Sequence, residues 1–207
     1  MSKYRLNVNV TGDDLNTIYA AKQRIVIAKH TAEQKSNVAW VSFKPFEHNT
    51  VDWETDFALY AATGEIQGGA KIAKLSDCSG QTQINATFAN GYFSSSQPDN
   101  QIGPNSYEIT NSDKDNALLT FGLAQSISVN GTAYDEHPIN AILVPRGNSA
   151  VMTPIEKIDV FLESNIESST VLSRIYTKCI TLVYQGDTTE LSLNYDPING
   201  IFYPASK

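Results

Sequence analysis

Apolar and polar residues alternate along several short segments of the chain, which is the pattern of half-buried β-strands. Residues 4–10 carry apolar side chains on one face and Arg5, Asn7 and Asn9 on the other. A longer alternation over residues 51–60 predicts another strand. Residues 24–29 are apolar on both faces, which is typical of a strand in the middle of a sheet.

A change of period after the first strand predicts one short N-terminal helix. Residues 11–14 interrupt the alternation, and Leu15, Ile18 and Tyr19 follow at helical spacing. Asp13 and Asp14 would lie in the first turn, where the helix dipole favours negative charge.

Turn signals predict antiparallel pairing of the strands. The dipeptide Asn-Gly, which tolerates the positive φ angles of a tight hairpin turn, occurs at residues 90–91, 130–131 and 199–200. Residues 94–105 and 111–116 are polar and read as loops. Further strands are predicted over residues 38–43, 81–89, 139–144, 158–162, 171–184, 189–195 and 201–203.

These elements predict a mainly β protein, an antiparallel β-sandwich with one short N-terminal helix. A closed barrel has the same alternation and stays an alternative. The sequence contains no internal repeat and no shift in composition that would mark a linker. We therefore expect a single β-rich domain over residues 1–207.

The charge balance narrows the choice of partners. The net charge is −7, and the 15 Lys and Arg residues are spread thinly. This disfavours nucleic acid and anionic membranes, both of which attract basic clusters. A neutral polar ligand such as a glycan, a cation or a metal ion fits better. No apolar run reaches the roughly 20 residues of a transmembrane helix, and the N-terminus lacks a secretory pattern, which predicts a cytoplasmic protein.

Three carboxylates form the local pattern that most specifically indicates a functional site. Asp52, Glu54 and Asp56 share one face of the predicted strand at alternate positions. Several carboxylate oxygens suit Ca²⁺, so these residues are candidate metal ligands. A pair of them would also suit glycoside hydrolysis. The simplest alternative is a solvated outer face whose charges discourage edge pairing.

Candidate ligand-binding residues lie on the same strand and in the first polar loop. Tyr60 is predicted on the acidic face, and the loop contributes a set of polar side chains. Ten Tyr residues and abundant Asn and Ser suit recognition of polar ligands. Trp40 and Trp53 are predicted in the core, because both share strand faces with other large apolar residues. The loop candidates are Ser95, Gln97, Asp99 and Asn100.

Catalytic signatures are absent from the sequence. Cys78 lies in a turn-like segment and Cys179 in a predicted strand, where we expect it to be buried; both are predicted to be free thiols. The three His residues stand far apart, and no common nucleophile, zinc or nucleotide motif occurs. We therefore expect a protein that is not an enzyme and that has no cofactor, with a bound Ca²⁺ ion as the one alternative.

Together the patterns favour a non-catalytic recognition module of the lectin-like or adhesion type. Its expected ligand is a neutral polar molecule such as a glycan, bound through loops at one end of the sandwich. One alternative is a self-assembling or protein-interaction β protein that forms homo-oligomers. A further alternative is a pore-forming, toxin-like protein, for which residues 125–134 have the polarity but not the length of a membrane hairpin.

Overall fold

The computed structural model describes residues 2–64, 66–79, 82–173 and 178–205, with only the backbone of residues 95 and 96. Strands account for 56% of the chain and helix for 5%. The predicted fold class is confirmed: the protein is mainly β, with several antiparallel sheets in a sandwich-like fold. Within the described ranges the strands do not close into a barrel.

The largest sheet has nine strands. They are β1 (Lys3–Asn9), β5 (His48–Glu54), β6 (Ala58–Ala62), β7 (Ser76–Ser79), β11 (Leu118–Val129), β12 (Thr132–Pro138), β13 (Ile142–Pro145), β18 (Glu190–Asp196) and β19 (Ile201–Pro204). Their order is β19-β18-β1-β5-β11-β6-β7, and β12 and β13 also pair with β11. The 12 residues of β11 thus pair with four other strands, which makes it the centre of this sheet.

Three smaller sheets complete the fold. Their orders are β17-β15-β2-β4, β14-β10-β8-β9 and β16-β3. The strands are β2 (Gln23–Thr31), β3 (Val38–Ala39), β4 (Val41–Phe43), β8 (Ile84–Ala89), β9 (Tyr92–Pro98), β10 (Tyr107–Asn111), β14 (Ser149–Met152), β15 (Pro154–Ser164), β16 (Thr170–Val171) and β17 (Ile180–Val183). As the apolar pattern predicts, β2 is internal, because it lies between β15 and β4.

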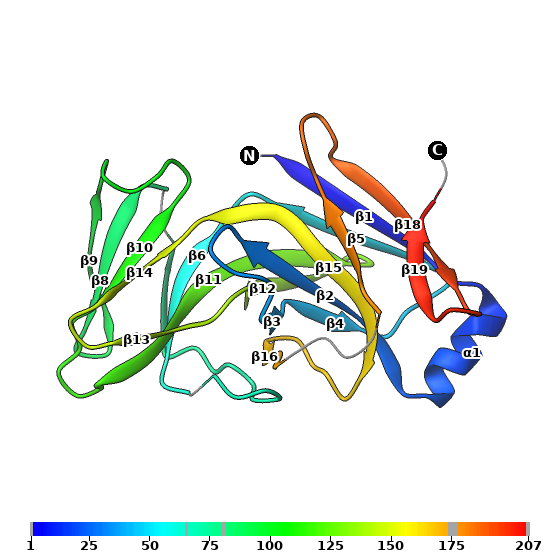
Figure 1. Ribbon diagram of the computed structural model, residues 1–207, viewed down its shortest axis with the longest axis horizontal. Coiled ribbons are helices and arrows are strands. Elements are labelled where there is room, and N and C mark those ends of the chain that lie inside the picture. The colour runs from blue at the N-terminus through cyan, green and yellow to red at the C-terminus, as the bar shows by residue number, and fades with distance from the viewer. Residues whose placement is uncertain (1, 65, 80–81, 174–177, 206–207) are drawn as a thin grey trace.

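One hydrophobic core joins the three larger sheets. It contains Leu6 from β1, Ile109 from β10 and Val160 from β15. Trp40 and Trp53 are both buried in it, which confirms their predicted core placement. Figure 1 shows the sheet that contains β8 and β9 at one end of the long axis and the single helix at the other.

The predicted helix is α1 (Gly12–Ala20), and it buries Leu15 and Ile18 against the core. Asp13 and Asp14 lie in its first turn, as the sequence predicts. Lys22 follows the helix with a left-handed backbone, φ 55°. This conformation commonly ends a helix, and here it leads the chain directly into β2.

The Asn-Gly turns join antiparallel strands, as predicted. Both residues of the pairs 90–91 and 130–131 have positive φ angles, between 51° and 85°. In the third turn only Gly200 does, because residues 197–200 form a longer connection. Two pairs, β1 with β18 and β8 with β10, are parallel. Strand patterning alone does not reveal these long-range pairings.

Several predicted boundaries are wrong. Residues 51–60 form two strands, because the chain turns after β5, where the backbone N–H of Asp56 donates to the carbonyl of Glu54 at 2.9 Å. Residues 38–43 are likewise divided between β3 and β4 at Trp40. The predicted loop 94–105 begins as strand, since β9 extends to Pro98.

The two cysteines are free thiols, as predicted, but their surroundings differ from those expected. Cys78 is half-buried on β7, and burial raises its pKa to about 11. Cys179 is exposed just before β17, so its expected burial is wrong. Among the described residues no helix is long and apolar enough to cross a membrane.

Candidate functional site

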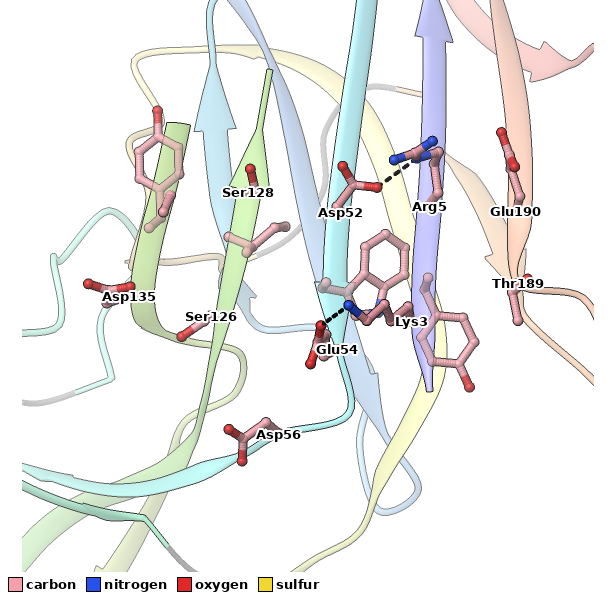
Figure 2. A pocket seen from close by; sticks show the side chains of 15 residues that line it. Lys3, Arg5, Asp52, Glu54, Asp56, Ser126, Ser128, Asp135, Thr189 and Glu190 are labelled. Carbon is pink, nitrogen blue, oxygen red and sulfur yellow. Dashed lines mark hydrogen bonds and ion pairs between the residues drawn. The ribbon is translucent and has the colours of Figure 1, made fainter. Parts of the chain in front are cut away.

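A cleft of about 580 Å³ lies over five neighbouring strands of the largest sheet, β18-β1-β5-β11-β12 (Figure 2). We call it the acidic cleft, because carboxylates outnumber cations in its lining. Its residues are Lys3, Tyr4, Arg5, Asp52, Trp53, Glu54, Asp56, Ser126, Ile127, Ser128, Ala133, Tyr134, Asp135, Thr189 and Glu190.

Strand register aligns four polar residues in one row across the sheet. Ser128 is opposite Asp52, Asp52 is opposite Arg5, and Arg5 is opposite Glu190. Directly paired residues project to the same face, so four separate strands present these side chains together. Figure 2 shows Asp52 and Arg5 turned toward each other, with Ser128 and Glu190 on either side.

Two ion pairs fix part of this lining. Arg5 Nε is 2.7 Å from Asp52 Oδ1, and Lys3 Nζ is 2.9 Å from Glu54 Oε1. The hydrogen bond and charge of Asp52 raise the pKa of Arg5. Five carboxylates face these two cations, so the cleft keeps an excess of negative charge and of hydrogen-bond acceptors.

The polar row continues as a ladder of amides toward the far ends of β1 and β18. Asn7 Nδ2 donates to Glu190 Oε1 at 2.7 Å, and Asn9 Nδ2 donates to Asn194 Oδ1 at 3.1 Å. His48 on β5 lies 3.1 Å from Asn9 Oδ1. The face that carries the cleft therefore stays polar along β1 as far as Asn9.

The opposite face of the same strands is apolar and holds a buried charge. Trp53 Nε1 donates to Glu156 Oε2 at 2.9 Å, and Lys29 Nζ lies 2.8 Å from the same oxygen. Lys29 is 0% exposed and also donates to Gln125 Oε1 at 2.9 Å. Burial lowers its pKa to about 8, although Glu156 opposes this shift.

The structure brings the three predicted acids to the lining of one cleft. Asp52 and Glu54 are each held by a cation, and Asp56 lies beyond the end of β5. Among the described residues no group of three or more His, Cys, Asp or Glu side chains is placed to hold a metal ion. The Ca²⁺ site stays a prediction from the sequence.

The other predicted ligand residues are not part of the acidic cleft. The prediction that Tyr60 is an exposed ligand-binding residue is wrong. Tyr60 is fully buried, and its hydroxyl donates to the carbonyl of Asn140 at 2.6 Å. Tyr60 lies on the face of β6 opposite Leu59, as the alternation predicted, but Ala62, Ala124 and Ile72 form a second apolar cluster that buries it there. The polar set belongs to a different sheet: Ser95 and Gln97 are on β9, and Asp99 and Asn100 follow it.

Sequence reasoning missed much of the lining, including Arg5, Ser128, Asp135 and Glu190. The alternation of residues 4–10 placed Arg5 on a polar face, which is the one signal that was available for it. The other three enter the site only through pairing of strands that are distant in the sequence.

A buried cluster around Asp159 has residue types used in nucleophilic catalysis, but not the arrangement. Ser36 Oγ donates to Asp159 Oδ2 at 2.6 Å, and His30 Nε2 is 2.8 Å from the same oxygen. Thr181 donates to the other oxygen at 2.6 Å. An activated serine bonds to the histidine base itself. Here both groups bind the carboxylate, which is typical of a structural network.

Comparison with known proteins finds no relative: no family model matches the chain, and no curated protein or solved structure does. The evidence for function therefore comes from the chain's own residues.

Proposed function

We propose that the protein is a non-catalytic recognition module that binds a neutral polar ligand, such as a glycan, in the acidic cleft. The observation that carries this proposal is the row formed by Ser128, Asp52, Arg5 and Glu190. It displays a hydroxyl, two carboxylates and a guanidinium side by side on one face of a sheet. Such a row matches the closely spaced hydroxyl groups of a sugar.

The chemistry of the lining favours a ligand rich in O–H donors. Ionised carboxylates only accept hydrogen bonds, and such charge-assisted bonds are stronger than neutral ones. The five carboxylates disfavour an anionic ligand by like-charge repulsion. The ring of Tyr134, half-buried beside Asp135, offers an apolar surface for a sugar face.

The size and support of the cleft also fit a small ligand. Its volume of about 580 Å³ lies within the usual range of small-molecule sites. All of its lining side chains except those of Asp56 and Thr189 project from paired strands, so their positions are set before the ligand arrives. Preorganisation of this kind reduces the entropy that binding costs.

A thermal unfolding screen against neutral mono- and disaccharides tests the proposal. A sugar at about 100 times its Kd adds roughly 2.7 kcal/mol of stability. This should raise Tm by roughly 5–11 °C for a chain of this length. Glu190→Gln, which keeps the shape of the cleft lining, should reduce the shift.

The matched control is Asp187→Asn, which neutralises an exposed carboxylate between β17 and β18 and should preserve the shift. If no sugar raised Tm, or if both variants kept the full shift, the acidic cleft would not be the binding site.

Self-association is a second candidate, favoured by the hairpin of β18 and β19. Its turn exposes Ile198 to 93%, and Tyr203 is exposed on β19, which ends the order of the nine-stranded sheet. Exposed apolar residues at a sheet edge favour pairing with another chain. Sedimentation analysis should then show concentration-dependent dimers that Ile198→Asp removes. A monomer at all concentrations would exclude this candidate.

A further inference from the structure

A second cavity, of about 660 Å³, lies on the other side of Tyr134. We call it the basic cavity. Its lining comes from the residue before β2, from β2, β4 and β12, and from the connections between β6 and β7 and between β15 and β16. The residues are Lys22, Arg24, Ser42, Lys71, Tyr134, His137, Asn165, Ile166, Glu167, Ser168 and Ser169.

The charge of this cavity is opposite to that of the chain. The protein has a net charge of −7 and only 15 Lys and Arg residues, yet three of them, Lys22, Arg24 and Lys71, line this one cavity. Glu167 is the single carboxylate in the lining. Three cations, two from the start of β2 and its preceding residue and one from the connection between β6 and β7, create a positive field in an otherwise acidic molecule.

Arg24 is held in a fixed orientation within the lining. Its Nε donates to Ser42 Oγ and its Nη2 donates to the Ser42 carbonyl, both at 2.9 Å. These two bonds use two of the five N–H groups of the guanidinium. The planar fork is thus positioned by Ser42 and retains donors for an oxyanion, which Arg binds in a bidentate manner.

Hydroxyl groups supplement the cations. Ser168 Oγ accepts the backbone N–H of Ser42 at 2.9 Å, so its own O–H hydrogen is not used in that bond. Ser42 Oγ in turn donates to the Ile166 carbonyl at 2.6 Å, which ties the β15–β16 connection to β4. A fixed serine donor beside a fixed guanidinium is suited to the oxygens of a sulfate or phosphate group.

Unusual backbone conformations gather at the same place. Of the eight non-glycine residues with positive φ in the described chain, three line the basic cavity: Lys22 at 55°, Asn165 at 61° and Ser169 at 64°. Residues other than Gly and Asn rarely adopt a positive φ angle. Conformations of this kind persist where the surrounding structure enforces them, and they concentrate at ligand sites.

Glu167 already acts as an anion in this field. It lies 3.0 Å from Lys71 Nζ, and the hydrogen bond and charge of Lys71, together with the charge of Arg24, lower its pKa. Both side chains of this ion pair are more than 60% exposed, so it is weak. An incoming oxyanion with more negative charge would compete with this carboxylate for Lys71.

We propose that the basic cavity is a binding site for a tetrahedral oxyanion, a sulfate or phosphate group, held by Arg24, Lys71 and Ser168. This site is distinct from the acidic cleft and does not depend on glycan binding there. The two share Tyr134 as a common wall, so a ligand that carries both a neutral sugar and an acidic ester would fit across them.

Titration with sodium sulfate and sodium phosphate at constant ionic strength tests the proposal, with the amide NMR signals of Ser42 and Ser168 as the readout. Both signals should move and saturate. Arg24→Gln should weaken binding about tenfold or more, because it removes charged hydrogen bonds. Glu167→Gln should strengthen binding about threefold, because it removes the competing carboxylate.

The gain from Glu167→Gln guards against misfolding, since a damaged fold does not bind more tightly. Lys71→Gln should lose affinity, whereas Lys114→Gln, an equal charge change at an exposed residue between β10 and β11, should not. Methyl sulfate and methyl phosphate then distinguish the two ester types. Equal responses to chloride, or no effect of Glu167→Gln and Lys71→Gln, would overturn the proposal.

Discussion

Ion pairs of nearly equal length lie on the two sides of β5 in opposite environments, one with Asp52 of β5 itself and one between Lys29 of β2 and Glu156 of β15. On one face Arg5 and Asp52 are 2.7 Å apart, with about half of each side chain exposed. On the other side, Trp53 donates a hydrogen bond to Glu156, which lies 2.8 Å from Lys29. Lys29 is fully buried. The buried pair is a structural element, because an unpaired charge there is costly. The exposed pair adds little stability, so its charges are free to serve recognition.

The surroundings of Lys29 explain why its pair matters. The ammonium nitrogen lies 5.2 Å from the ring centre of Trp40, 5.8 Å from that of Trp53 and 5.2 Å from that of Phe57. These ring faces and the oxygens of Glu156 and Gln125 replace the water that burial removes.

The largest predicted effect is therefore that of Lys29→Met. It leaves the largely buried Glu156 without its cation and should lower the free energy of unfolding by about 3–5 kcal/mol in urea titrations. Adding Glu156→Leu should recover about half of this loss, since the uncompensated charge is then gone. A loss below about 1 kcal/mol for the single variant would mean that the buried pair stabilises the protein no more than the exposed pair does.

The pH dependence of stability gives a second, smaller effect. Lys29 has a pKa of about 8 in the folded protein and 10.5 as its ordinary value. Above pH 8 the unfolded chain binds more protons, so the free energy of unfolding rises with pH. Between pH 7.5 and 9 the wild type should gain about 1 kcal/mol relative to Lys29→Met.

Comparison with Lys29→Met cancels other titrations that both proteins share. Burial raises the pKa of Cys78 to about 11 and of Tyr107 to about 12, and these groups lower stability as pH rises further. Equal pH profiles for the two proteins would show that Lys29 does not titrate in this range.

The smallest predicted effect belongs to the exposed face. Asp52→Asn removes the charge that pairs with Arg5, but water already solvates both groups. We expect Tm without ligand to change by about 2 °C or less, measured by circular dichroism. A loss of stability as large as that for Lys29→Met would show that the row of Ser128, Asp52, Arg5 and Glu190 has a structural role.

Local patterns predicted the parts of the site that lie within one strand. Alternation placed Arg5 and Asp52 outward and Trp53 inward, and all three predictions agree with the structure. The same rule failed at Tyr60, because β6 is buried on both faces and a second apolar cluster with Ala62 and Ala124 covers the face that carries Tyr60. The three residues between β5 and β6 also leave no clear mark in the hydrophobic pattern.

Long-range pairing made the rest unpredictable. Lys29 stands at the end of an apolar run, and its partner Glu156 is 127 residues away. The basic cavity likewise collects Lys22, Lys71 and Glu167 from three segments. Composition alone, with its net charge of −7, indicated no basic site.

The most direct test of the recognition role is the sugar screen repeated on Asp52→Asn. We predict that the sugar which raises Tm of the wild type by roughly 5–11 °C loses most of its effect on the variant, while the Tm values without ligand agree. An undiminished rise of Tm in Asp52→Asn would contradict the assignment of the row of Ser128, Asp52, Arg5 and Glu190 as the binding surface.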